Sequence, residues 1–341
     1  MSNITFDPVS ITKKLLGGLG SKPRYVLEER FGLTSASTRT LESIGREYGI
    51  TRERVRQIES FAINKVRCAE ELSLFADNFN ELKNYIDANG HLTQEENLLS
   101  SLFKNEKERK HAYFLLVLGE GFENIKGCSN FHSAWTTDLE KAGEIRKAFD
   151  GFHNEIKNEI LFSEKDVLDI LKRYLAKVMG DKIDKDVLLS LIKVSRVVGS
   201  NVLGEWGLSS SPYIRPRGMR DYAFLVMRKH GSPMHFSETA KSIGEIFNKP
   251  AHIQTVHNEL IKGEHFVLVG RGLYALKDWG YEGGIVRNVI ESILSNHGGI
   301  SKEEIVKRVL KERYVKENTI LVNLQNKKYF KKDSRGNYAL L

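Results

Sequence analysis

Apolar residues recur at helical spacing through the first 72 residues and predict several short helices. Leu41 and Ile44 are three positions apart, and Val55, Ile58 and Ala62 follow at intervals of three and four. Glycine-rich residues 17–20 and the Ser/Thr-rich residues 34–38 interrupt this pattern and predict loops. We therefore expect a helical domain over residues 1–72.

A second pattern repeats beyond residue 80. Signals typical of a helix start occur at Thr93, Ser163, Ser237 and Ser301. A tryptophan follows each of the first three starts after 42 or 43 residues. This constant spacing indicates tandem duplication of one structural unit. We expect four units, of which the first two are fainter, over residues 80–137, 141–214, 217–280 and 281–341.

The last two units show the order of their elements most clearly. Residues 217–280 contain three helical patterns, followed by two short apolar runs around the turn at residues 270–272, which predict a β-hairpin. Residues 281–341 repeat this order. Three helices and a hairpin make a winged helix. The predicted fold class is therefore all-α with small β-wings: an N-terminal helix-turn-helix followed by tandem winged-helix domains.

The stretch TLESIGREYGITRERVRQIE, beginning at Thr40, predicts the helix-turn-helix. A first helix is expected over Leu41–Tyr48. Gly49 suits its left-handed C-cap, Ile50 fills the gap between the helices, and Thr51 is an N-cap candidate for the second helix. Two helices across a three-residue turn are typical of this DNA-binding motif.

The second helix has an apolar side and an exposed polar side. Its N-terminal end enters the major groove in this motif, and the outward residues there are Arg52, Glu53, Arg56 and Gln57. Arginine can pair with guanine, glutamine with adenine, and glutamate with the cytosine amino group. Phosphate contacts are predicted for Arg54, Lys65 and Arg67. The alternative is an exposed face on which the glutamate only complements the helix dipole.

The charge distribution extends this interpretation to the C-terminal end. The chain has a net charge of +8: residues 1–72 carry 12 basic and 9 acidic side chains, residues 73–216 carry 19 and 22, and residues 281–341 carry 12 and 7. Basic ends are expected to approach phosphate, although ordinary solubilising charge is an alternative. Wing contacts to DNA are predicted for Arg271, Lys331, Lys332 and Arg335.

Residues 11–68 closely resemble region 4 of the sigma-70 family, on the motifs YVLEERFGL and TLESIGREYGITRERVRQIESFAINKVR. Region 4 recognises the minus-35 promoter element and packs on RNA polymerase. The resemblance implies base readout by Arg52, Glu53 and Gln57, with Arg56 beside them. It also implies that Thr51 contacts the DNA backbone. Two positions depart from the family, where basic residues are common: Phe61 and Asn64. No counterpart of region 2, which melts the minus-10 element, is found.

Residues 219–281 resemble a second family, the HARE-HTH winged helices, on the motifs MRDYAFLVMRKHGSPMHFSETAKSI and TVHNELIKGEHFVLVGRGLYALKDWGY. This family includes the N-terminal domain of the RNA polymerase delta subunit and modules attached to DNA-modifying or chromatin proteins. The resemblance implies a winged-helix fold, but its members bind either DNA or protein.

Other kinds of chemistry have little support in the sequence. The two cysteines, Cys68 and Cys128, imply neither a disulfide framework nor a zinc site. His252 and His257 have poor spacing for metal ligands on one helix face, and residues 270–272 lack the context of a phosphate loop. We expect no enzyme activity, cofactor or metal. No apolar run reaches the length of a membrane span and no secretion signal is visible, so a cytoplasmic, nucleoid-associated protein is expected.

These patterns lead to one main functional hypothesis. It is a sequence-specific transcription regulator or sigma-like factor that binds promoter-like double-stranded DNA and RNA polymerase. Two alternatives remain open: a delta-like polymerase accessory subunit that acts mainly through protein contacts, and a DNA-binding module of a DNA-modification or mobile-element system.

Overall fold

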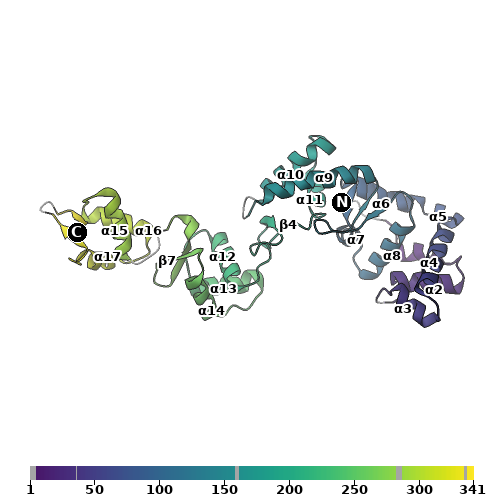
Figure 1. Ribbon diagram of the computed structural model, residues 1–341, viewed down its shortest axis with the longest axis horizontal. Helices are drawn as coiled ribbons and strands as arrows, with labels where there is room; N and C mark the ends of the chain where they lie inside the picture. Colours follow the sequence, from purple (N-terminus) through teal and green to yellow (C-terminus); the bar gives the residue numbers. More distant parts are fainter. Residues whose placement is uncertain (1–4, 36, 158–160, 282–285, 334–335) are drawn as a thin grey trace. The chain divides into compact units, whose positions relative to one another are not determined.

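The computed structural model describes residues 5–35, 37–157, 161–281, 286–333 and 336–341 (Figure 1). The chain divides into two compact units, Met1–Gly199 and Ser200–Leu341. Both are mostly helical and carry small antiparallel sheets, which confirms the expected helical class with minor β-structure. Among the described residues, no helix is long and apolar enough to cross a membrane.

The first unit begins with four helices, α1 (Pro8–Leu16), α2 (Ser21–Phe31), α3 (Leu41–Tyr48) and α4 (Arg52–Arg67). The carboxylate of Asp7 caps α1 by accepting hydrogen bonds from the backbone N–H groups of Val9 and Ser10. Helix α2 ends at Gly32, whose φ of 65° is in the left-handed region that glycine adopts without strain. The predicted bounds of the first motif helix are confirmed.

Two apolar clusters hold these four helices in place. A small one contains Val26, Ile44 and Val55 and joins α2, α3 and α4. A larger one joins α1, α2 and α4 and also includes Phe114, Leu115 and Leu118, which come from a later helix. The N-terminal helices therefore share a continuous core with the segment that follows them.

That following segment runs through α5 (Glu70–Ser73), α6 (Ala76–Ala88), β1 (Leu92–Gln94), α7 (Glu95–Leu102), α8 (Glu106–Leu118), β2 (Glu123–Ile125) and β3 (Ala134–Thr136). Its three strands form an antiparallel sheet in the order β1-β3-β2. The predicted helix start at Thr93 is wrong: this buried residue lies in β1, opposite Trp135. The short strand ends before α7 begins, and its pairing takes precedence over the capping motif.

Three further helices complete the first unit: α9 (Leu139–Ile156), α10 (Glu164–Met179) and α11 (Lys185–Ile192), followed by β4 (Val198–Ser200). The Ser163 hydroxyl accepts a hydrogen bond from the backbone N–H of Asp166, so the predicted helix start here is confirmed. Helices α9 and α10 pack on each other, and Phe149 and Phe152 are fully buried.

The second unit starts with β5 (Trp206–Leu208) and continues through α12 (Met219–His230), β6 (Met234–His235), α13 (Phe236–Phe247), α14 (Ile253–Lys262), β7 (Phe266–Gly270), β8 (Leu273–Leu276) and the 3-10 helix η1 (Lys277–Trp279). The strand order β6-β8-β7 is equivalent to the order β1-β3-β2 of the three-stranded sheet in the first unit. The predicted hairpin is confirmed, but Ser237 is not the N-cap of α13, because His235 occupies that position.

The last part contains α15 (Val286–His297), α16 (Lys302–Glu312), α17 (Glu317–Leu324), β9 (Phe330–Lys332) and β10 (Tyr338–Leu340). Ser301 caps α16, as predicted, by accepting a hydrogen bond from the backbone N–H of Glu304. Strands β9 and β10 pair antiparallel, and Ile300 forms a bridge with Tyr338. Ile300 therefore pairs like a short strand just before α16, as β1 does before α7 and β6 does before α13.

Candidate DNA-binding site

The turn between α3 and α4 is tightly constrained. Gly49, with a φ of 63°, ends α3, and the Thr51 hydroxyl caps α4 by accepting a hydrogen bond from the backbone N–H of Arg54 at 3.1 Å. A Cβ at Gly45 would lie 2.6 Å from the carbonyl oxygen of Ile50. Only glycine lets the chain fold back this closely on α3. The three-residue turn and both caps are confirmed.

Helix α4 turns one side into the core and the other to solvent. Val55 and Ala62 are fully buried, and Ile58 is half-buried beside them. The first two turns of the helix bring together on the exposed side the four residues predicted to read bases: Arg52, Glu53, Arg56 and Gln57. The start and the rotation of this exposed segment are both fixed. The N-cap sets where α4 begins, and the buried residues set which side of the helix faces solvent.

The polar residues on this face also pair with one another. The guanidinium of Arg56 donates two hydrogen bonds to the Glu53 carboxylate, at 2.9 and 2.7 Å. The Arg54 guanidinium donates one to the side-chain oxygen of Gln57 at 3.1 Å. The hydrogen bonds from Arg56 hold the pKa of Glu53 below its ordinary value. The face therefore presents oriented donors and acceptors at its N-terminal end.

A polar network that the sequence did not reveal fixes α3 against α2. The Arg39 guanidinium contacts the Glu47 carboxylate, the Tyr25 hydroxyl at 3.2 Å and the Glu29 carboxylate at 3.4 Å. The Tyr25 hydroxyl donates to Glu47 at 2.7 Å. Hydrogen bonds from Tyr25 and then Arg39 lower the pKa of Glu47. Because Arg39 directly precedes the N-cap residue of α3, its contacts help to set the angle between α2 and α3.

The residues predicted to touch phosphate have different surroundings. Arg54 and Lys65 are exposed on α4, and Thr51 is exposed at its start. The Arg67 guanidinium instead donates to the carbonyl oxygens of Val117, at 2.5 Å, and Leu118, at 3.2 Å, at the end of α8. These bonds engage Arg67 in the packing of α4 on α8, and its phosphate contact remains a prediction.

The predicted wing residues belong to the second unit. Arg271 is exposed in the turn between β7 and β8, and Lys331 and Lys332 are exposed in β9. The ammonium group of Lys332 lies over the ring of Tyr338, 5.8 Å from its centre. Arg335 lies outside the described residues.

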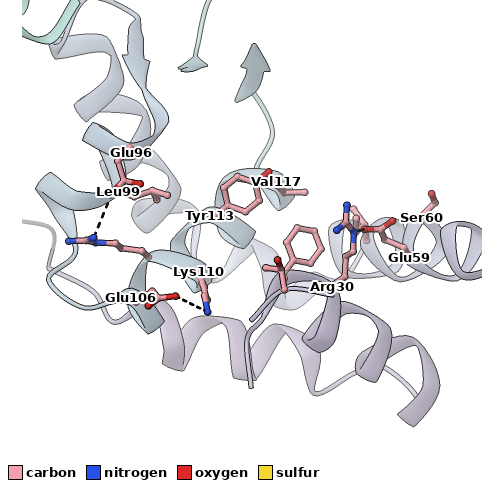
Figure 2. A pocket seen from close by; sticks show the side chains of 13 residues that line it. Arg30, Glu59, Ser60, Glu96, Leu99, Glu106, Lys110, Tyr113 and Val117 are labelled. Atoms are coloured by element: carbon pink, nitrogen blue, oxygen red, sulfur yellow. Dashed lines mark ion pairs between the residues drawn. The ribbon is translucent and has the colours of Figure 1, made fainter. Parts of the chain in front are cut away.

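A groove of about 920 Å³ lies beside α4, between α2 and the pair α7 and α8 (Figure 2). Its apolar lining includes Phe31 and Tyr113. Its charged groups pair with one another across short distances: Arg30 with Glu59 at 3.3 Å, Lys110 with Glu106 at 3.0 Å and Arg109 with Glu96 at 3.8 Å. The lining therefore combines apolar surface with charges that are already neutralised locally.

The described residues do not bring potential metal ligands together at one place. No group of three or more potential metal ligands occurs among them. The His153 ring nitrogen Nε2 lies 2.8 Å from the Ser195 hydroxyl, but both side chains are buried. That hydroxyl also accepts hydrogen bonds from the backbone N–H groups of Val197 and Val198, so the pair serves the local packing.

The helix-turn-helix region defines the class of domain to which this site belongs. Residues 15–67 match the family model described as Sigma-70, region 4. The match spans α2, α3 and α4 and the end of α1. It therefore identifies a sigma-70 region 4 domain at the N-terminal end of the chain.

RNA polymerase sigma factors are among the proteins that this chain resembles. The chain is 51% identical over 53 residues to the sigma factor SigA of Listeria monocytogenes, covering 16% of this chain and 14% of that protein. It is 40% identical over 74 residues to SigA of Clostridium acetobutylicum, covering 22% and 18%. It is 44% identical over 57 residues to RpoD of Neisseria gonorrhoeae, covering 17% and 9%. The chain thus spans less than a fifth of the length of these relatives.

Proposed function

We propose that this protein is a sequence-specific, non-enzymatic transcription factor of sigma-like type that reads promoter-like double-stranded DNA through α4. The observation that carries this proposal is the exposed face at the start of α4, held in a helix-turn-helix whose sequence matches region 4. The similarity to RNA polymerase sigma factors supports transcription initiation as the process and RNA polymerase as a partner.

The chemistry of the face gives each residue a role in the groove. Arg52 and Arg56 can donate to guanine, Gln57 can pair with adenine, and Glu53 can accept from the cytosine amino group. The ion pair between Glu53 and Arg56 is exposed to solvent and contributes little by itself, so both side chains can turn to the bases. We propose contacts with the DNA backbone for Arg54, Lys65 and the Thr51 hydroxyl.

We further propose that the remainder of the chain is a tandem array of winged helices with the boundaries expected from the sequence. Support comes from the element order helix, strand, helix, helix, strand, strand, which occurs from α6 to β3 and from α12 to β8 with equivalent strand orders. Residues 219–281 would be the HARE-HTH module. Arg271, Lys331 and Lys332 would add sequence-independent contacts to phosphate.

The first of these units uses its third helix, α8, to hold the DNA-reading helices. Six residues of α8 are buried, and three of them lie in the core shared with α1, α2 and α4. The side of α8 that packs on these helices is not available to a DNA groove. We propose that this unit supports the reader and does not itself bind DNA.

The direct test is selection of bound DNA from a random library, with the wild-type protein and the Arg52→Ala variant. We expect a short preferred motif for the wild type, and in the variant a loss of about 1–3 kcal/mol and relaxed preference at one base pair. The matched control is Arg46→Ala, because Arg46 is an exposed arginine on α3 outside the readout face. If Arg52→Ala keeps the wild-type preference at every position, readout by Arg52 is refuted.

The role of RNA polymerase is tested separately by co-purification. A sigma-like factor should bind polymerase and also select a DNA motif. Polymerase binding without any preferred motif would favour the delta-like accessory role, for which the resemblance of residues 219–281 is the supporting observation. A preferred motif without polymerase binding would favour a role outside transcription initiation, such as a DNA-modification or mobile-element system.

A further inference from the structure

The row of outward-facing residues on α4 continues past the four residues assigned to base readout. Glu53, Gln57 and Phe61 are spaced four residues apart, so their side chains follow one another along the same side of the helix. The Phe61 side chain is 60% exposed, although phenylalanine is strongly apolar. This places a large apolar group directly beyond the position proposed to read adenine.

Basic residues border this row on both sides. Arg54 and Lys65 are exposed beside Phe61, seven and four positions away along the helix, and Arg52 and Arg56 border the opposite side. A helix in the major groove meets bases along its centre and phosphates along both walls. The cations next to Phe61 favour a polyanion as the covering partner over an apolar protein surface.

We propose that Phe61 contacts the 5-methyl group of a thymine in the major groove and so extends the recognised motif beyond the base pair read by Gln57. This inference rests on the proposed function of α4. The thymine methyl is the apolar group that distinguishes one base in this groove, and phenylalanine is among the side chains that recognise it. Covering both groups removes apolar surface from water, which provides the selectivity.

The test compares thymine with deoxyuridine, which pairs identically but lacks the methyl group. Each thymine of the motif selected by the full-length protein is replaced singly, and affinity is measured by fluorescence anisotropy for wild type and Phe61→Ala. We expect one substitution to weaken wild-type binding about fourfold, the effect of uncovering one methyl group. Phe61→Ala should bind both DNAs equally, whereas Phe61→Leu should keep part of the difference.

The matched control is Leu74→Ala, because Leu74 is an exposed apolar residue that follows α5 and lies outside the readout helix. It should keep the wild-type response to deoxyuridine. If a motif is selected but no thymine methyl contributes, or if Phe61→Ala responds to deoxyuridine as the wild type does, the contact by Phe61 is refuted while readout by α4 stands. If Phe61→Ala instead loses only polymerase binding, the residue contacts protein and the inference is wrong. Absence of any preferred motif would refute the proposed function itself.

Discussion

Phe114 lies in α8, outside the matched region, yet we expect its replacement by alanine to destabilise the DNA-reading helix. Its side chain is fully buried, and its ring centre lies 4.9 Å from that of Phe31 in α2. The same cluster contains Leu27 from α2 and Ala62 from α4. Phe114 therefore fills the space between the reader and the unit that follows.

The magnitude follows from complete burial. Truncation of a buried phenylalanine to alanine costs about 3–5 kcal/mol, as the sum of lost transfer free energy and the remaining cavity. For a cooperative unit of this size, each kcal/mol lowers the melting temperature by about 2–4 °C, so a fall of about 6–20 °C is expected. A change this large is a substantial part of the stability of an ordinary domain.

Hydrogen exchange measured by mass spectrometry can localise the effect. In Phe114→Ala, peptides from α4 and from α6 should lose protection together, because both helices belong to one cooperative unit. Ile290→Ala provides the matched control, since Ile290 is fully buried in the separate core of the last module. If α4 keeps its wild-type protection in Phe114→Ala while α8 exchanges faster, the reader folds independently and the shared-core argument is wrong.

Three further predictions concern the turn, the buried histidines and the basic hairpin. Gly45→Ala should destabilise the first unit by about 1–3 kcal/mol in urea unfolding, whereas Gly143→Ala, with open space around the new methyl group, should be neutral or stabilising; equal effects would contradict the close approach at Gly45. Burial lowers the pKa of both His111 and His153, so the unfolded chain binds more protons and stability should fall as the pH drops below about 6.5; urea midpoints that do not change between pH 7 and 5 would exclude this. Replacing Lys331 and Lys332 together by glutamine should reduce the slope of log affinity against log salt by about 1.8, and an unchanged slope would reject their contact with phosphate.

The helix-turn-helix could be predicted from sequence because its determinants are local. Gly49 and Thr51 specify where one helix ends and the next begins, and the apolar residues between them and beyond fix the rotation of α4. The resulting prediction of an exposed face required no knowledge of distant segments. The motif helix Leu41–Tyr48 has the predicted bounds for the same reason.

Features that depend on contacts across the sequence were missed. Arg39 resembles an ordinary surface residue until α2 and α3 bring carboxylates to it. The bonds from Arg67 to α8 join positions about 50 residues apart, which no local pattern reveals. Thr93 shows the opposite error: its local capping pattern was sound, but pairing of β1 with β3 determined the conformation.

The contrast between α8 and the third helices of the last two units has a consequence for how the protein would bind DNA. Helix α14 buries only Val256 and Leu260, and α17 only Ile320 and Leu324, so each has a side exposed to solvent. Since one side of α8 is taken up by packing on the reader helices, we expect DNA binding in the first unit to depend on α4. A single helix offers few contacts, and we therefore propose that the second unit adds affinity through tethering, which raises its effective concentration near bound DNA. Base specificity and salt-dependent affinity would accordingly reside in different parts of the chain.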